Sequence, residues 1–212
     1  MNIKNDIQTI RMLRQSARTK NTSIVRPAEK YQNLGPIPKK FIRLDPWEID
    51  YLYIVAKTAK KGILETGRLM GGSTVLLSLA NQNVPIYSID INPVDDVYAR
   101  QVMDLCGVGI NTHLIEGDSQ KSKYDIILGY DVLFVDGDHS FDGCLNDLNN
   151  WWDDLPIGGH VILHDCYFGS PVQEAVIEFL REKKVRIHTT PFIPVNHSMV
   201  LTGSLCHFQK EA

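Results

Sequence analysis

Ionisable side chains gather directly after two apolar segments of the chain. Asp136, Asp138 and His139 follow the first segment, and the adjacent pair His164 and Asp165 follows the second. If both segments are neighbouring strands of a parallel sheet, their carboxyl ends meet at one edge, where such sheets bind ligands. Carboxylate oxygens with open water positions suit Mg²⁺, and a histidine among them shifts the preference toward Mn²⁺, Fe²⁺ or Zn²⁺. The pattern therefore indicates a divalent-cation site, while helix capping and a turn are the alternative explanation of these acids.

A glycine-rich segment, residues 65–74, lies between a predicted strand and a predicted helix. Its glycines let the backbone approach a ligand, and the start of the helix offers free N–H groups. The G-x-G-x-x-G dinucleotide pattern and the G-K-[ST] phosphate loop are both absent. Asp90 ends the next predicted strand, 23 residues after Gly67, where a carboxylate can accept both hydroxyl protons of a ribose. The two features together indicate a nucleoside-like ligand, whereas a tight strand–helix turn would explain the glycines alone.

A third polar segment, residues 116–119, ends another predicted strand. Asp118 and Ser119 in this segment could face the edge of an adenine ring, and a simple turn is the alternative. Histidines at 113, 160, 188, 197 and 207 fall outside these segments, and the sequence assigns them no role.

The elements that position these residues alternate between strands and helices. Strands are predicted over residues 62–66, 85–91, 113–116, 132–136, 160–164, 185–189 and 199–205. Helices are predicted over residues 45–62, 73–82, 94–106, 141–155 and 170–183. The pairs Asp45 with Glu48 and Ser170 with Gln173 have the spacing of capping boxes and mark the starts of the first and last of these helices. No helix fits between the last two strands, so these are expected to pair antiparallel. The prediction is an α/β fold: a Rossmann-like, doubly wound, seven-stranded sheet, mostly parallel with an antiparallel last strand and helices on both faces.

Charge divides the 212-residue chain into two regions. Residues 1–43 hold ten Lys and Arg against two acids, and the remainder holds twelve against twenty-three. We therefore expect a basic N-terminal arm over 1–44, with a helix over 1–22 and an extended connector, before a single domain over 45–212. The arm could pack on the acidic body of a second subunit and form a homo-oligomer, it could close over the substrate, or it could remain solvated.

Composition also narrows the class of protein. No apolar stretch is long enough to span a membrane, and the N-terminus lacks the apolar run of a secretory signal. Four widely spaced cysteines favour reduced thiols and a cytoplasmic protein. The acidic body argues against nucleic acid as a partner.

Over residues 45–205 the chain resembles class I S-adenosylmethionine-dependent O-methyltransferases. The most specific part is FVDGDHSFDGCLNDLNNWWDDLPIGGHVILHD, which is similar to a bacterial branch whose signature reads DGDHSY, then a Gly-Gly turn, then HD. The group also contains catechol and caffeoyl-CoA O-methyltransferases and the sugar-modifying enzymes of macrolide and aminocoumarin biosynthesis.

The resemblance implies a cofactor, a metal and a base. S-adenosylmethionine would be held by Glu65, Gly67, Gly71, Ser73, Asp90, Asp118, Ser119 and Asp136. A divalent metal, Mg²⁺ or Mn²⁺, would bind Asp136, His164 and Asp165, although the family usually has an acid where this chain has His164. His139 stands where animal and plant relatives place a lysine that deprotonates the acceptor, and the acceptor would be a small-molecule or sugar hydroxyl.

Other functions stay open beside this one. The same signature occurs in proteins that resemble cephalosporin hydroxylase, so an oxygen-using enzyme is one alternative, and a non-catalytic S-adenosylmethionine-binding protein is another. A nucleic-acid amino-methyltransferase is disfavoured because the [DNS]-P-P-[YFW] motif is absent after the fourth predicted strand.

Overall fold

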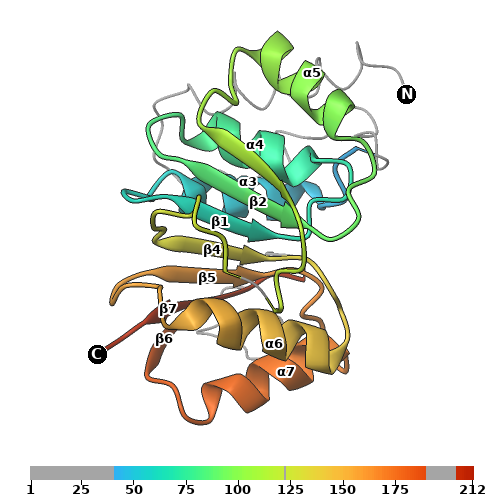
Figure 1. The fold of residues 1–212 in the computed structure, drawn as a ribbon. Coiled ribbons are helices and arrows are strands. Elements are labelled where there is room, and N and C mark those ends of the chain that lie inside the picture. Colours follow the sequence, from blue (N-terminus) through green and yellow to red (C-terminus); the bar gives the residue numbers. More distant parts are fainter. Residues whose placement is uncertain (1–40, 122, 190–203) are drawn as a thin grey trace.

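Seven strands form one sheet in the computed structural model, which describes residues 41–121, 123–189 and 204–212. The strands are β1 (Ile63–Thr66), β2 (Ile86–Asp90), β3 (Thr112–Glu116), β4 (Val132–Val135), β5 (His160–Leu163), β6 (Val185–Thr189) and β7 (Cys206–Lys210). Their order is β3-β2-β1-β4-β5-β7-β6 (Figure 1). Neighbours from β3 to β5 pair parallel, and β7 pairs antiparallel with both β5 and β6. The predicted mostly parallel sheet with an antiparallel last strand is confirmed.

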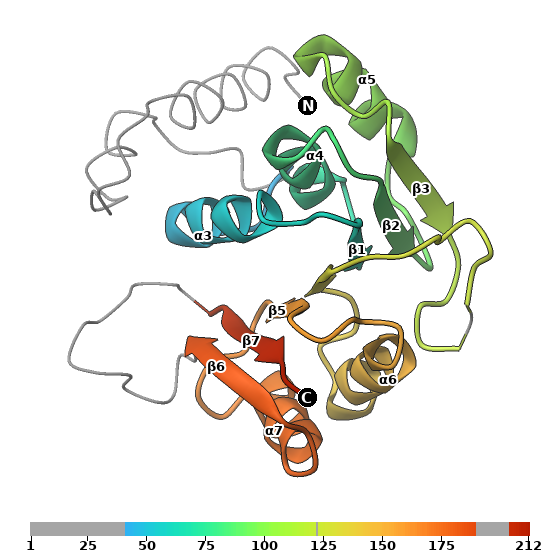
Figure 2. The same ribbon diagram turned by 90° about the vertical axis from the view of Figure 1, so that its left-hand side faces the viewer.

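Helices cover both faces of this sheet (Figure 2). On one face lie α3 (Pro46–Ala56), α4 (Gly72–Ala80) and α5 (Asp96–Cys106), and on the other lie α6 (Phe141–Trp152) and α7 (Pro171–Leu180). Successive residues of a strand point to opposite faces, so a strand covered on both sides is apolar throughout. In β4, Leu133 and Val135 pack in the core under α6 and α7, while Val132 and Phe134 pack under α3 and α4. The core therefore consists of two layers separated by the sheet.

Helix starts follow the predicted capping signals. In α3, Asp45 is the N-cap residue, Pro46 occupies the first turn, and the side chain of Glu48 accepts the Asp45 N–H at 2.7 Å. In α7, the Ser170 hydroxyl accepts the Gln173 N–H at 3.1 Å. Helix α3 ends at Ala56, a few residues before the predicted end at Lys60–Gly62.

The last strand that the structure describes lies after the predicted range. Strand β7 begins at Cys206, whereas the prediction placed the last strand over 199–205, of which residues 199–203 fall outside the described residues. The prediction was based on a run of apolar residues, whereas the strand forms where successive side chains can face the two covered sides of the sheet in turn. Cys206 and Phe208 pack under α6 and α7, and His207 between them contacts α3 on the opposite face.

The N-terminal helix and most of the connector fall on residues 1–40, outside the described residues. Within the predicted arm, Phe41, Ile42 and Leu44 are buried against the domain. Among the described residues, none of the helices combines the length and apolar character needed to cross a membrane.

The order of the strands reverses direction beside β1, since β2 lies on one side of it and β4 on the other. Loops that leave the carboxyl ends of neighbouring strands diverge at such a point and leave a crevice between them. Gly67, directly after β1, has a φ of 86°, and a Cβ there would overlap the carbonyl oxygen of Asp136 after β4. Glycine thus allows two loops of the crevice to touch.

Candidate active site

A cavity of about 680 Å³ opens at the carboxyl edge of the sheet. Its walls come from the loops after β1, β2, β3, β4 and β5 and from the segment before α3. Ten of the residues singled out from the sequence line it: Gly67, Ser73, Asp90, Asp118, Ser119, Asp136, Asp138, His139, His164 and Asp165. Residues from five separate strand ends therefore meet in one place.

Glu65 and Gly71 do not line this cavity. Glu65 is fully buried, and its Oε2 accepts hydrogen bonds from the hydroxyls of Thr74 and Ser88, each at 2.5 Å. Burial raises the pKa of this carboxyl. Glu65 thereby joins β1, β2 and α4 beneath the glycine-rich loop. Gly71, with a φ of 82°, is the N-cap residue of α4.

Asp90 is held rigidly at the end of β2. Its Oδ2 accepts the N–H groups of Arg68 and Leu69, both at 2.7 Å, and its Oδ1 accepts the N–H of Asn92 at 2.8 Å. A carboxylate offers about four lone-pair positions, so acceptor capacity remains for a ligand hydroxyl. The carboxylate therefore fixes the shape of the glycine-rich loop as well as lining the cavity.

The side chain of Arg68 was not singled out from the sequence. Its guanidinium is buried and makes a two-point contact with Asp96, at 2.7 and 2.9 Å, and its Nη1 donates to the carbonyl oxygen of Ser88 at 2.5 Å. These contacts join the glycine-rich loop to β2 and to the start of α5. The sequence signal that could have revealed Arg68 is a long, charged side chain within a loop of small residues.

Asp147 on α6 is a second residue that the sequence did not reveal. Its carboxylate accepts the hydroxyl of Ser119 at 2.7 Å and the hydroxyl of Thr66 at 2.9 Å. Burial raises the pKa of Asp147 to about 6, against the effect of these two hydrogen bonds. Asp147 therefore links the ends of β1 and β3 below the cavity floor.

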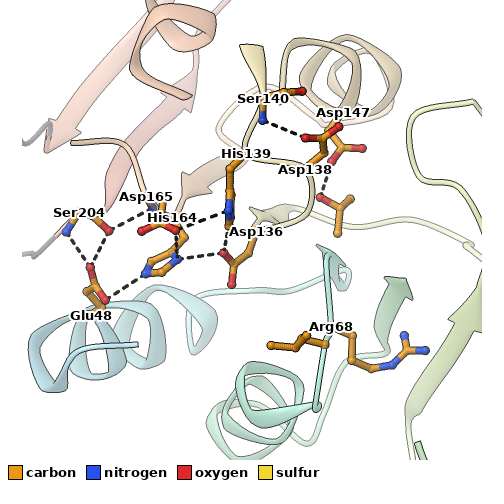
Figure 3. A network of polar contacts seen from close by, with 12 residues as sticks. Glu48, Arg68, Asp136, Asp138, His139, Ser140, Asp147, His164, Asp165 and Ser204 are labelled. Carbon is orange, nitrogen blue, oxygen red and sulfur yellow. Dashed lines mark hydrogen bonds and ion pairs between the residues drawn. The ribbon is translucent and has the colours of Figure 1, made fainter. Parts of the chain in front are cut away.

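Four ionisable residues converge at the ends of β4 and β5 (Figure 3). Asp136 Oδ1 lies 2.9 Å from Nδ1 of His164 and 3.3 Å from Nε2 of His139. Asp165 Oδ2 lies 3.6 Å from Nδ1 of each histidine. The structure thus brings together the predicted metal ligands and the predicted base.

Glu48 extends this group from the opposite side. Its Oε2 lies 3.2 Å from Nε2 of His164, and its Oε1 accepts the N–H and the hydroxyl of Ser204 at 2.7 and 2.8 Å. The sequence indicated only a capping role for Glu48, and that role is also present. Because Glu48 and His164 are 116 positions apart, no local pattern could have paired them.

The charges in this group shift one another's protonation. Burial opposes protonation of His164, but hydrogen bonds and charge from Asp136 and Glu48 outweigh it and raise its pKa to about 10. Burial would likewise raise the pKa of Asp136, yet the two histidines lower it below its usual range. A hydrogen bond to Asp136 raises the pKa of His139.

The arrangement fits a divalent cation. Ligand atoms of one ion, each about 2.0–2.2 Å from it, lie roughly 3 Å apart, as Asp136 Oδ1 does from Nδ1 of His164 at 2.9 Å. Histidines that bind metals usually donate their other ring N–H to a carboxylate, and Glu48 offers that acceptor at Nε2 of His164. Because its raised pKa keeps His164 protonated near neutral pH, a cation between Asp136 and Asp165 would have to displace the proton from Nδ1.

Comparison with known proteins shows what the central part of the chain is similar to. Residues 64–166 match the model of a family described as a methyltransferase domain. A search of curated protein sequences gave no match.

Solved structures share the fold at low sequence identity. The O-methyltransferase NovP is 13% identical with a TM-score of 0.62, covering 81% of this chain and 83% of its own. CalS11, a TDP-rhamnose 3′-O-methyltransferase of calicheamicin biosynthesis, is 15% identical with a TM-score of 0.57, covering 95% and 92%. A Streptococcus mutans protein in complex with S-adenosylhomocysteine is 16% identical with a TM-score of 0.60, covering 77% and 97%. Residues 64–166 are thus similar to a methyltransferase domain, and the chain shares the fold of these methyltransferases, as the resemblance predicted.

Proposed function

We propose that the protein transfers a methyl group from S-adenosylmethionine to a hydroxyl oxygen of a small molecule or sugar, assisted by a divalent cation, Mg²⁺ or Mn²⁺. The observation that carries this proposal is the shared cavity. It is lined both by Asp90 with the glycine-rich loop and by the group of Asp136, His139, His164 and Asp165. A nucleoside-binding end and an ionisable end therefore face one space.

The chain's own residues would position the cofactor. Asp90, fixed by three backbone N–H groups, accepts hydrogen bonds from the ribose hydroxyls. Asp118 and Ser119 border the adenine, and Gly67 and Ser73 let the start of α4 approach the methionine part. We also assign Glu65 and Gly71 to cofactor binding. They would act indirectly, by fixing the shape of the glycine-rich loop from below.

The ionisable end would act on the acceptor. Asp136, His164 and Asp165 would hold the cation, which lowers the pKa of a bound hydroxyl and orients it when present. His139 is about half exposed, and its ring nitrogens lie near both carboxylates. It would take the hydroxyl proton while the acceptor oxygen forms a bond to the methyl carbon and the sulfur–carbon bond breaks, leaving S-adenosylhomocysteine.

Catalysis would otherwise rest on positioning. An in-line methyl transfer needs the oxygen, the carbon and the sulfur aligned, and holding two reactants in that geometry removes much of the entropic barrier. Asp136 lies at the centre of the ionisable group and lines the cavity that Asp90 also lines. It is therefore suited to align the two reactants.

Cofactor binding is tested by calorimetry with S-adenosylhomocysteine. The wild type should bind with a free energy on the order of −8 kcal/mol, which corresponds to micromolar affinity. Asp90→Ala should lose roughly 1.5–3 kcal/mol for each hydrogen bond to the ribose. Glu116→Ala is the matched control, because Glu116 pairs with Asp90 in the sheet register but does not line the cavity. Absence of binding by the wild type, or equal binding by Asp90→Ala, would contradict the proposal.

One observation favours a second candidate function. Asp136, His139 and His164 place one ligand atom each within 4.8 Å of one another. Two histidines and one carboxylate are the ligand set of non-haem iron oxygenases, so an oxygen-using enzyme similar to cephalosporin hydroxylase is the alternative. Iron-dependent oxygen consumption without methyl transfer would favour that alternative. Transfer of label from the S-adenosylmethionine methyl group to an acceptor would favour the methyltransferase.

A further inference from the structure

Three histidines gather on the sheet away from the cavity. His160 starts β5, His188 lies on β6 and His207 lies on β7, and none of them lines the cavity. One ring nitrogen from each lies within 4.8 Å of one from each of the others. Nδ1 of His160 is 2.9 Å from Nε2 of His207.

Strand register explains why residues so far apart in sequence meet. In the β5–β7 pair His160 is opposite Gln209 and Ile162 is opposite His207, so the two histidines are diagonal neighbours on one face. In the β6–β7 pair Thr189 is opposite His207. The register shifts between Ile187 and Thr189, so His188 lies at an irregularity of the strand, and its ring stacks on that of His207 with ring centres 4.4 Å apart.

Polar side chains around the cluster orient the rings. The hydroxyl of Tyr51, on α3, lies 2.8 Å from Nδ1 of the buried His207. When Nδ1–H donates to that oxygen, Nε2 of His207 presents a lone pair toward His160. The amide oxygen of Gln209 lies 3.3 Å from Nε2 of His188.

The surroundings of the cluster favour neutral rings. Burial lowers the pKa of His207 to about 2, with charge repulsion from His188 and His160 adding to the effect. Burial also lowers the pKa of His160. Neutral imidazole is the form that binds metals.

We propose that His160, His188 and His207 form a binding site for a divalent transition-metal ion, Zn²⁺ being the ion that their chemistry favours. Imidazole nitrogens suit zinc, and three histidines leave the fourth tetrahedral position for water. His188 is exposed, so its ring can turn from the stacked position to aim a nitrogen at the ion, a motion that exposed side chains make within nanoseconds. Tyr51 would be the second-sphere partner that fixes the His207 ring.

This site would add a tie across three neighbouring strands. In the described part of the chain, β6 is one edge of the sheet and pairs with β7 alone. An ion shared by β5, β6 and β7 would join that edge to the parallel part of the sheet and, through Tyr51, to α3. The proposal does not depend on the methyltransferase chemistry, because the three histidines lie outside the cavity.

The test measures zinc in the full-length protein. Wild type, His188→Ala, His160→Ala and His113→Ala are stripped with chelator, exposed to Zn²⁺, dialysed and analysed by elemental mass spectrometry. His113→Ala is the matched control, since His113 stacks on Tyr87 of β2 and belongs to neither ionisable group. Any zinc held in the cavity is common to all four proteins and cancels in the comparison.

We expect His188→Ala and His160→Ala to hold about one zinc ion per chain less than wild type and His113→Ala. His188 is exposed, so its replacement should leave the fold intact. Tyr51→Phe should weaken zinc binding by about 10–100-fold in competition with a chromogenic chelator. Equal zinc content in all four proteins would overturn the proposal, and the cluster would then be a hydrogen-bonded chain from Tyr51 through His207 to His160.

Discussion

Replacing Asp147 by asparagine should stabilise the protein above neutral pH. Burial holds the pKa of this carboxyl at about 6, compared with 3.8 for the ordinary group. The folded state therefore binds the proton more tightly than the unfolded state, and stability falls as the pH rises from about 4 to 6. A difference of about 2 pKa units corresponds to about 3 kcal/mol, lost fully above pH 6.

Asparagine mimics the protonated acid. Its amide can still contact the hydroxyls of Thr66 and Ser119, because a hydroxyl both donates and accepts. Asp147→Asn should therefore avoid the cost of a buried charge. For a chain of this length, we expect a melting temperature roughly 6–12 °C above wild type at pH 8, and no difference at pH 4.

Differential scanning calorimetry between pH 4 and 8 measures this effect. Asp125→Asn is the control, because it removes the same charge from an exposed loop and should leave the pH profile unchanged. Asp147→Ala should be less stable than wild type at pH 4, since the hydroxyls of Thr66 and Ser119 lose their partner. Identical pH profiles for wild type and Asp147→Asn would refute the reasoning.

Three further predictions concern the proposed site and the arm. Glu48→Gln should weaken Mn²⁺ binding by about 10–100-fold. The new amide can donate a hydrogen bond to Nε2 of His164, which would place the ring proton on Nδ1 and remove the lone pair that binds the ion. Unchanged affinity in a Mn²⁺ titration would exclude this role for Glu48. His139→Ala should lower the rate of methyl transfer by about 10²–10⁴, with S-adenosylhomocysteine affinity unchanged in calorimetry, and a rate close to wild type would remove His139 as the base. Deleting residues 1–40 should lower activity or dissociate an oligomer while cofactor affinity persists, as measured by light scattering and calorimetry. Tight, salt-sensitive nucleic-acid binding by the full chain would contradict the expectation for this arm.

Local patterns in the sequence were sufficient for most of the fold. Capping residues marked the starts of α3 and α7, and alternating strands and helices predicted a mostly parallel sheet. Such signals depend on residues a few positions apart, so they can be recognised without knowing which helices and strands pack together. The polar residues at strand ends could be placed together for the same reason, because parallel strands present their carboxyl ends at one edge.

Long-range contacts were decided by the tertiary structure alone. The position of β7 depends on which residues face α3 and which face α7, and an apolar run does not carry that information. Arg68 could be judged only once its buried partners on β2 and α5 were known.

The environment of the ionisable residues was decided in the same way. The sequence determined that Asp136, His139, His164 and Asp165 follow two strands, and hence that they share an edge of the sheet. Only the folded chain set Glu48 against His164 and joined His160, His188 and His207 from three strands. The physical reason is that residue type and spacing fix local backbone preferences. The protonation and ligand-binding capacity of a side chain depend instead on burial and on charges brought near by distant segments.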